Sequence, residues 1–306
     1  MNDEGIAKVK ELWGAQVGTW RVGRGVHWLE HPKVQERINL KVVGEPGPDR
    51  YQYFVRKYLA GRLPVERALT LGCGAGEFER GMTQYGFCRE HEAIDLAEGA
   101  IEKAKEQARA EGLTHISYRV ADLNELTLPA GRFDVIFGIS SVHHVAALER
   151  LYEQIAGALK PGGLFFMDEF VGPSQYQFTE AQLREVNEQL RVMPPVLKRS
   201  VTRQDEIKPP VVRPTLEQMN AVDPSEAIRS AEIIPLLSRY FDVLEVKGQG
   251  GSLLHLLLED IAGNFDQENG GSLDYLQRLF QLEDRLIAEG ALQDDFATIV
   301  ARKRSA

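Results

Sequence analysis

The segment ALTLGCGAGE (68–77) decides the fold, because it places three glycines at alternate positions directly behind a short apolar run. A glycine-rich turn between a strand and a helix lets a ligand approach the backbone closely, and the helix N-terminus presents unpaired N–H groups. A dinucleotide fingerprint that starts at Gly72 requires glycine at position 77, where this chain has Glu77. No Lys-Ser or Lys-Thr pair follows the last glycine, so the segment favours neither a dinucleotide nor a nucleoside triphosphate.

Strand and helix signals alternate on the C-terminal side of this turn. Short apolar runs are separated by amphipathic stretches of good helix formers. The first five predicted strands are 67–72, 91–96, 116–122, 133–140 and 164–170, and two more are predicted at 242–250 and 295–303. Strands joined by helical crossovers form a parallel sheet. The sequence therefore predicts an α/β fold, with a doubly wound, mostly parallel sheet of seven strands and helices on both faces.

The chain divides into four predicted parts. A helical cover is predicted over 1–60 and the ligand-binding core over 61–170. The polar sequence over 171–228 has helical character and is interrupted by MPPVL, KPPVVRP and VDPSE. This pattern predicts a helical insertion after the fifth strand. Residues 229–306 are predicted to complete the core.

The composition of the chain indicates which partners and which compartment to expect. The 306 residues carry a net charge of −9 and contain no block of Lys or Arg, so nucleic acid is not an expected partner. No run of 18 or so apolar residues occurs, and the N-terminus lacks a cationic segment followed by an apolar one, so neither a membrane span nor a secretion signal is expected. Only two cysteines are present, which fits a reducing compartment, and the cytoplasm is expected.

The spacing of Gly72, Gly74 and Gly76 resembles motif I of the class I S-adenosylmethionine-dependent methyltransferases. The resemblance implies a Rossmann-like fold, S-adenosylmethionine as cofactor and S-adenosylhomocysteine as product. In that family an acid that closes the second strand binds both ribose hydroxyls, and Asp95 stands there. An acid after the third strand contacts the adenine amino group, and Asp122 matches it. The cofactor contacts implied in this way are Gly72, Cys73, Gly74, Gly76, Asp95, Leu96, Asp122, Leu123 and Ile139.

The resemblance is specific over about residues 66 to 170. GISSVHHV and LKPGGLFFMDE match the stretches around the fourth and fifth strands of the family. One position departs from the pattern, since the family usually has an acid two residues before the first glycine and this chain has Thr70. Outside the core, HWLEHPKVQERIN and DEFVGPSQYQF resemble a subgroup associated with polysaccharide and glycoside biosynthesis, which suggests a sugar or glycoside as acceptor.

Methyl transfer to a hydroxyl needs a base near the ends of the fourth and fifth strands. His143 and His144 stand there, and His144 is the preferred base. Adjacent strand residues point to opposite faces, so only one of Asp168 and Glu169 is expected to line the pocket, and Glu169 is predicted as base or as ligand for substrate hydroxyls. No cluster has convincing metal-ligand spacing, so no metal is predicted, although His143, His144 and Glu169 can meet in space.

Substrate contacts are predicted outside the core. His27 and Trp28 lie in a segment that can close over the cofactor and exclude water. Arg199, together with Arg203 and Arg213, would suit an anionic substrate, such as a phosphorylated or uronic sugar. Core packing for the aromatic residue and a solvated charged face for the arginines are the competing interpretations.

The sequence thus predicts methyl transfer to a small polar acceptor, by in-line displacement with a His or Glu base. A hydroxyl of a sugar or glycoside is the preferred acceptor, and an amine remains open because it can attack with its own lone pair. A cofactor-binding regulator without turnover and a use of the cofactor other than methylation also fit the motifs. A homodimer is left open as well.

Overall fold

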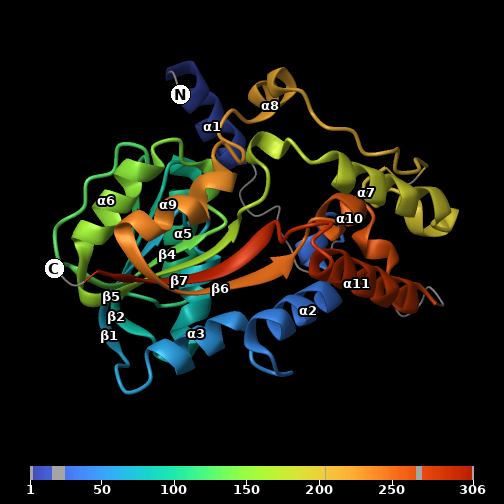
Figure 1. Cartoon of the computed structure of the whole chain (residues 1–306). Helices are drawn as coiled ribbons and strands as arrows, with labels where there is room; N and C mark the ends of the chain where they lie inside the picture. Colours follow the sequence, from blue (N-terminus) through green and yellow to red (C-terminus); the bar gives the residue numbers. More distant parts are fainter. Residues whose placement is uncertain (1–2, 16–24, 204, 267–270, 305–306) are drawn as a thin grey trace.

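A single twisted sheet organises the molecule (Figure 1). The computed structural model describes residues 3–15, 25–203, 205–266 and 271–304. The strand order is β3-β2-β1-β4-β5-β7-β6, with β1 to β5 parallel and β7 antiparallel to both of its neighbours. The strands are β1 (Val65–Leu71), β2 (Cys88–Asp95), β3 (Ile116–Val120), β4 (Phe133–Ile139), β5 (Leu159–Phe170), β6 (Phe241–Gly250) and β7 (Phe296–Lys303). The predicted mostly parallel, seven-stranded α/β fold is therefore confirmed.

Helices cover both faces of the sheet. Apolar side chains of α3, α4 and α5 pack on one face, and those of α6 and α9 pack on the other. The alternation of side chains along the strands explains this division: Leu69 and Leu71 face α6, whereas Ala68 faces α3 and α4. These helices are α3 (Arg50–Tyr58), α4 (Glu77–Met82), α5 (Glu98–Ala110), α6 (Leu148–Ala158) and α9 (Ile233–Tyr240).

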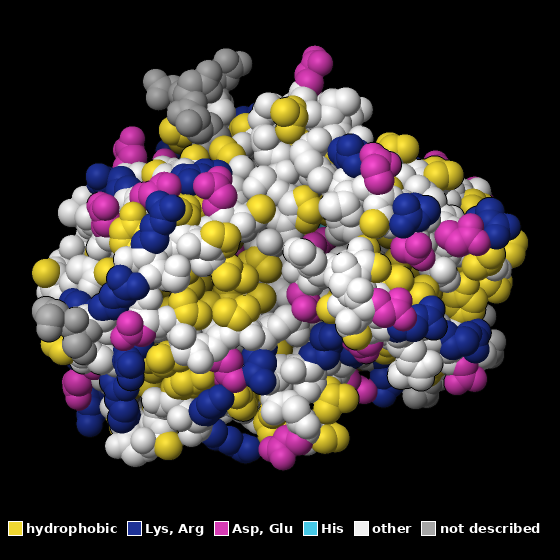
Figure 2. Space-filling view, viewed as in Figure 1, with side chains coloured by type: hydrophobic (Ala, Val, Ile, Leu, Met, Phe, Trp, Pro, Cys, Tyr) yellow, Lys and Arg dark blue, Asp and Glu magenta, His cyan; other side chains and the backbone are white. Residues whose placement is uncertain are grey.

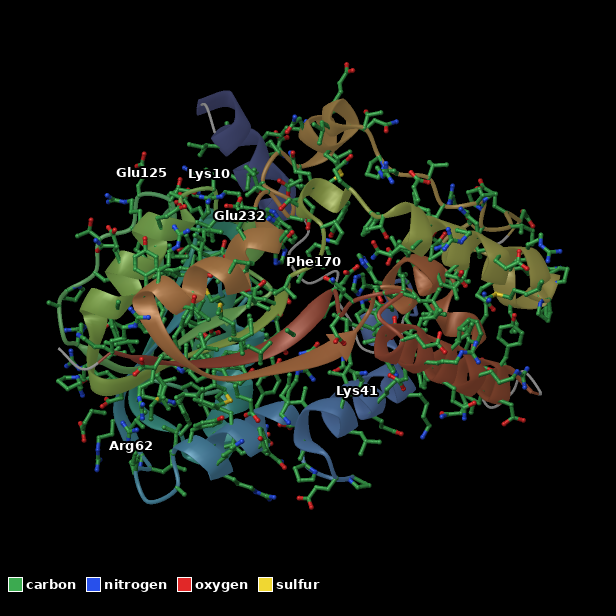
Figure 3. The ribbon with its side chains drawn as sticks, viewed as in Figure 1. Lys10, Lys41, Arg62, Glu125, Phe170 and Glu232 are labelled. Carbon is green, nitrogen blue, oxygen red and sulfur yellow. The ribbon has the colours of Figure 1, made fainter. Side chains whose placement is uncertain are left out.

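A second layer of helices lies beside the sheet, on the right in Figure 1. Its helices come from the N-terminal part, the insertion and the C-terminal part of the chain, and they share one apolar core. Phe170, at the end of β5, lies where the sheet meets this helical layer (Figure 3). The layer contains α2 (Pro32–Val43), α7 (Glu180–Val192), α10 (Leu254–Leu258) and α11 (Ser272–Ala288).

Two further helices lie close to each other at the top of Figure 1, namely α1 (Asp3–Ala15) and α8 (Leu216–Val222). Lys8 of α1 donates to the carbonyl of Ala221 in α8. The N-terminal region therefore splits: α1 contacts the insertion, α2 joins the helical layer, and α3 covers the sheet. The division of the chain into four parts stays a prediction.

Among the strands, β5 differs most from the sequence-based expectation. It begins at Leu159, not at 164, because Pro161, Gly162 and Gly163 run within the strand, where the pairing with β4 shifts register. Within the predicted helical cover, residues 28–43 form two helical pieces, a short 3₁₀ helix (Trp28–Glu30) and α2, which starts at Pro32 with His31 as its N-cap. Proline at the first helical position starts a helix because its missing N–H needs no partner there.

The visible surface mixes both signs of charge (Figure 2). An apolar area interrupts this pattern, and the exposed apolar side chains of the edge strand β6 are Val243, Leu244 and Val246. None of the helices in the described ranges is long and apolar enough to cross a membrane.

Candidate active site

A cavity of about 450 Å³ opens at the carboxyl ends of β1, β2, β4 and β5. Open α/β sheets bind their ligands at this edge. The cavity runs from the glycine turn to the insertion, and helix α1 contributes to its wall. Nine residues matter most for its chemistry: Gly72, Gly74, Asp95, Asp122, His144, Asp168, Ser225, Arg50 and Trp13.

The three glycines of the turn serve two different purposes. A Cβ on Gly72 would lie 2.4 Å from Cβ of Ser141, and one on Gly76 would lie 2.5 Å from the hydroxyl of Tyr118. A Cβ on Gly74 would meet no atom within 4 Å, and Gly74 lines the cavity. All three have positive φ. Gly72 and Gly76 thus allow close packing, whereas Gly74 leaves bare backbone facing the open space.

Two carboxylates flank the part of the cavity next to the glycine turn. Asp95, at the end of β2, accepts from the backbone N–H groups of Gly74 and Ala97, each at 2.8 Å. Burial raises the pKa of Asp95, and these N–H groups oppose that shift. Asp122 holds the following turn through Oδ1, which accepts from the backbone and side chain of Asn124 at 2.8 and 3.1 Å. Each oxygen of Asp95 keeps a second acceptor site, because a carboxylate oxygen has two lone pairs.

Thr70 stands where an acid was expected, and its surroundings are polar and closed. Its hydroxyl lies 2.9 Å from Nε2 of His91. Glu79 of α4 is fully buried beside it, and burial raises the pKa of this carboxyl to about 7. Glu79 and His91 line a second, smaller cavity of about 180 Å³. The carboxyl group of Glu79 therefore lies close to the turn, but it belongs to α4 and does not line the large cavity.

His143 and His144 form a 3₁₀ turn (Val142–His144) after β4, and they face different surroundings. His143 is buried, and its Nδ1 lies 2.7 Å from Oε2 of Glu169. Burial lowers the pKa of His143, but the charges of Glu169 and Glu226 outweigh it, so the net shift is upward. His144 lines the cavity, and burial together with the charge of His143 lowers its pKa. At neutral pH, His144 is therefore the neutral member of the pair.

Glu169 does not line the cavity, and Asp168 does. Glu169 is 1% exposed: Oε1 accepts from the backbone N–H groups of Ser141 and Val142, each at 2.7 Å, and Oε2 contacts His143. The choice of Glu169 as the cavity-facing acid was therefore wrong. Both faces of β5 are buried, so the sequence pattern could not show which of the two neighbours faces the cavity.

Asp168 is the centre of a buried polar network that sequence reasoning missed. Its Oδ2 accepts from the Tyr51 hydroxyl at 2.9 Å and from Nε of Arg50 at 2.5 Å, and its Oδ1 accepts from Gln249 at 2.5 Å. Gln249 also donates to the hydroxyl of Thr298 at 2.8 Å. These residues come from α3, β5, β6 and β7, so only the folded topology brings them together.

The comparisons with known proteins agree with this geometry. A family model described as a methyltransferase domain matches residues 69–167, which span β1 to most of β5. Residues 69–167 form a class I S-adenosylmethionine-dependent methyltransferase domain. S-adenosylmethionine is the cofactor of this domain, and the predicted cofactor is confirmed at that level.

Curated relatives of the methyltransferase domain have diverse printed names. The chain is 30% identical to a sterol 24-C-methyltransferase of Candida albicans. The match extends over 142 residues, which are 45% of this chain and 38% of that protein. It is 30% identical to the 27-O-demethylrifamycin SV methyltransferase of Amycolatopsis mediterranei, over 42% of this chain and 49% of that protein. It is also 30% identical to a ubiquinone biosynthesis O-methyltransferase of Coxiella burnetii, over 36% of this chain and 47% of that protein. The chain thus spans less than half of each of these relatives.

One solved structure matches almost the whole chain. A geranyl diphosphate methyltransferase, solved in complex with GPP and sinefungin, has a TM-score of 0.53 at 12% identity and covers 98% of this chain and all of that chain. This likeness supports the fold of the parts outside the methyltransferase domain.

The structure does not bring all predicted site residues to the large cavity. Of the nine predicted cofactor contacts, only Gly76 does not line it, since Gly76 packs against Tyr118. Trp28 is 0% exposed in the helical layer, which explains its presence by packing and not by substrate contact. His27 caps the 3₁₀ helix that contains Trp28, with Nε2 4.0 Å from Glu259. Arg199 is exposed and pairs with Ile207 in a β-bridge outside the cavity. The substrate roles of these three residues are therefore not supported.

The residues that could together hold a metal ion differ from the set considered in the sequence. One nitrogen from each of His143 and His144 and one oxygen of Glu226 lie within 4.8 Å of one another. Glu226, which also accepts from the Tyr176 hydroxyl at 2.8 Å, takes the place that was considered for Glu169. The expectation that the methyltransferase domain uses no metal stays a prediction.

Proposed function

We propose that the protein transfers a methyl group from S-adenosylmethionine to a hydroxyl oxygen of a small polar acceptor and releases S-adenosylhomocysteine. The main support for this proposal is that a single cavity contains both parts of the site. The glycine turn, Asp95 and Asp122 line it, and so does His144. A cofactor-binding part and a proton acceptor within one cavity are what O-methylation requires.

The cofactor lies along the glycine turn in this proposal. Asp95 binds the two ribose hydroxyls with the lone pairs that remain on its oxygens, while it keeps its bonds to Gly74 and Ala97. Asp122 binds the adenine amino group through Oδ2, since Oδ1 already holds Asn124. The open space beside Gly74 leaves room for the cofactor to approach the backbone.

His144 is the base in this proposal. In the displacement, the acceptor oxygen attacks the methyl carbon, the bond from carbon to sulfur breaks, and the hydroxyl proton moves to the imidazole. Burial lowers the pKa of His144, so the imidazole is neutral and able to accept a proton at pH 7. His143 suits a positioning role instead, because the carboxylates of Glu169 and Glu226 favour its protonated form.

The walls around His144 favour an acceptor with both apolar and hydroxylated parts. Trp13, Leu29 and Phe296 provide apolar surface to the cavity, and the Arg50 guanidinium provides N–H donors to oxygen. A sugar or glycoside combines a hydrophobic ring face with hydroxyl groups, so we retain it as the acceptor class. The free thiols of Cys73 and Cys88 support a reducing compartment, and we propose the cytoplasm.

A transfer assay tests the proposal. The full chain is incubated with S-adenosylmethionine labelled in its methyl group, against a panel of glycosides, phenols and small amines. We expect label to appear on a hydroxylated acceptor and the His144→Gln variant to lose this activity. Transfer to an amine that His144→Gln leaves unchanged would establish N-methylation instead, and would refute the role of His144 as base.

A further inference from the structure

The segment VDPSE (222–226) wraps around the two histidines, and the binding of the cofactor makes no use of it. It begins with the last residue of α8, and two residues beyond it the backbone N–H of Ile228 donates to the carbonyl of His143 at 3.1 Å. Asp223 is 4% exposed and Ser225 is 1% exposed. Buried polar side chains on a loop need a reason, because an unpaired one is costly.

The hydrogen bonds of this segment fix the position of a proton on His144. The hydroxyl of Ser225 lies 2.6 Å from Oδ1 of Asp223, and the backbone N–H of Ser225 donates to the same oxygen at 2.8 Å. A carboxylate only accepts, so the single hydroxyl proton of Ser225 points to Asp223. Ser225 can then only accept at its 3.0 Å contact with Nδ1 of His144. Nδ1 therefore carries the proton of the neutral imidazole, and Nε2 carries the lone pair.

The other oxygen of Asp223 ties this arrangement to α1. Oδ2 accepts from Nε1 of Trp13 at 3.1 Å. The Trp13 ring also contacts the imidazole of His144 edge-on, with ring centroids 5.1 Å apart. With both oxygens engaged, Asp223 cannot rotate freely, so the direction of the hydrogen bond from Ser225 is fixed as well.

We propose that Asp223 and Ser225 are positioning residues that hold His144 in the tautomer with the proton on Nδ1, so that Nε2 carries the lone pair that can accept a proton. The use of that lone pair in methyl transfer rests on the proposed function, whereas the tautomer itself does not. When Nε2 takes the acceptor proton, the imidazole becomes a cation with protons on both nitrogens. The charge of Asp223, linked through Ser225, stabilises this cation, and no proton has to leave Ser225 or Asp223.

Nitrogen NMR of the full chain labelled with ¹⁵N-histidine tests the proposal without any acceptor. Protonated and unprotonated imidazole nitrogens resonate far apart, and the His144→Gln variant identifies the signals of His144 among the seven histidines. At neutral pH we expect His144 to have a protonated Nδ1 and an unprotonated Nε2. A proton on Nε2 in the wild type would overturn the proposal.

Two variants test the cause of the tautomer. In Ser225→Ala the acceptor for Nδ1 is lost, and in Asp223→Ala the Ser225 hydroxyl becomes free to donate to Nδ1. In both we expect the unprotonated Nε2 signal to weaken as the proton divides between the two nitrogens. Ser225→Thr keeps the hydroxyl and should restore the wild-type pattern. A His144 that keeps its proton on Nδ1 in both Ala variants would refute the positioning role.

Ser230→Ala is the matched control, because Ser230 is another buried serine, five residues after Ser225 and just beyond the insertion. Its hydroxyl donates to the carbonyl of Gly172 at 2.8 Å and does not contact His144. We expect its His144 signals to equal those of the wild type. If Ser225→Ala does not fold, Ser225→Cys preserves the volume and weakens the hydrogen bond. Since the signals do not depend on turnover, their outcome and that of the transfer assay are separate.

Discussion

His144 and His143 are neighbours in sequence with opposite electrostatic environments. His143 lies between the carboxylates of Glu169 and Glu226, which raise its pKa, whereas burial and the charge of His143 lower the pKa of His144. A histidine with a lowered pKa is available as a base from the acid side of neutrality upward. In the proposed mechanism, His143 therefore positions the turn and His144 acts as the base.

Replacement of His144 should slow the chemical step selectively. We expect His144→Gln to lower kcat for methyl transfer to a hydroxylated acceptor by about 10²- to 10⁴-fold, which is the usual contribution of a general base. Its affinity for S-adenosylmethionine should remain close to that of the wild type, because the cofactor residues are untouched. Steady-state kinetics and calorimetry check the two parts. The control is His115→Gln, since His115 does not line the large cavity.

Glu79 gives a pH-dependent stability prediction. Burial raises the pKa of this carboxyl from 4.5 to about 7, so the folded state binds its proton more tightly than the unfolded state. The free energy of unfolding therefore falls as the pH rises from 4.5 to 7. Glu79→Gln removes this titration and should stabilise the protein above pH 7, by on the order of 3 kcal/mol. Below pH 4.5 the difference should vanish.

Urea denaturation at pH 4, 6 and 8 checks the Glu79 prediction. Glu77→Gln serves as control, because Glu77 lies in the same helix but lines the large cavity and is not buried. An equal effect of Glu79→Gln at all three pH values would show that burial of the carboxylate is not its cause.

The sequence predicted the residues that follow strands better than those that depend on distant contacts. Asp95 is the last residue of β2 and Asp122 lies two residues after β3, so the strand pattern places them at the cavity edge. Asp168 was passed over in favour of Glu169, because both faces of β5 are buried and alternation alone does not show which face lines a cavity. The proposed role of Ser225 could not be predicted, because it depends on a contact with His144, which lies 81 residues away in the sequence.

At the scale of elements, Glu169 fastens the turn after β4 to β5. Its carboxylate receives two backbone N–H groups of that turn and the side chain of His143. The segment around His143 also touches the insertion through Ile228. One buried carboxylate therefore connects the sheet, the turn with both histidines and, through His143, the insertion.

We expect Glu169→Gln to destabilise the protein by about 3 to 5 kcal/mol, since it breaks a buried charge pair and leaves the partner uncompensated. The loss should be fully present below pH 6.5, the unfolded pKa of histidine, because the folded pKa of His143 is raised above it. It should shrink as the pH rises through that raised value. Thermal or urea denaturation between pH 6 and 9 measures this trend, and a loss that grows with pH would contradict it.

The sheet was predictable from the sequence because its signals are local. β1, β4 and β5 contain apolar runs, each of β1 to β5 is followed by a helix or a turn, and the crossover rules then fix a parallel arrangement. The helical layer was not predictable in the same way. Its core joins α2, α7, α10 and α11, which are far apart in the chain, and no local pattern shows that their apolar faces meet.

For the molecule as a whole, the helical layer matters because it packs against the sheet close to the cavity, to whose wall it contributes Leu29 and Gln35. Trp28 lies at the centre of this contact: it is 0% exposed, and its ring is 4.9 Å from that of Phe296, which begins β7 and lines the cavity. The layer is thus joined to the sheet by aromatic packing next to the active site.

Loss of the Trp28 side chain should weaken the whole fold. We expect Trp28→Ala to lower the free energy of unfolding by about 3 to 5 kcal/mol, as for other fully buried aromatic residues. Trp13→Ala is a matched comparison, because Trp13 is only half-buried on the cavity wall, and we expect it to cost less than half as much. Urea denaturation of both variants measures the difference, and equal losses would argue against Trp28 as a core residue.

We propose that the cavity binds S-adenosylmethionine through Asp95. Isothermal titration calorimetry of the full chain with S-adenosylmethionine and S-adenosylhomocysteine, beside an Asp95→Ala variant with a matching circular dichroism spectrum, measures this binding. We expect the wild type to bind both ligands at one site and the variant to bind each at least tenfold more weakly. A folded, ligand-free wild type that binds neither, or a variant that binds as tightly as the wild type, would contradict it.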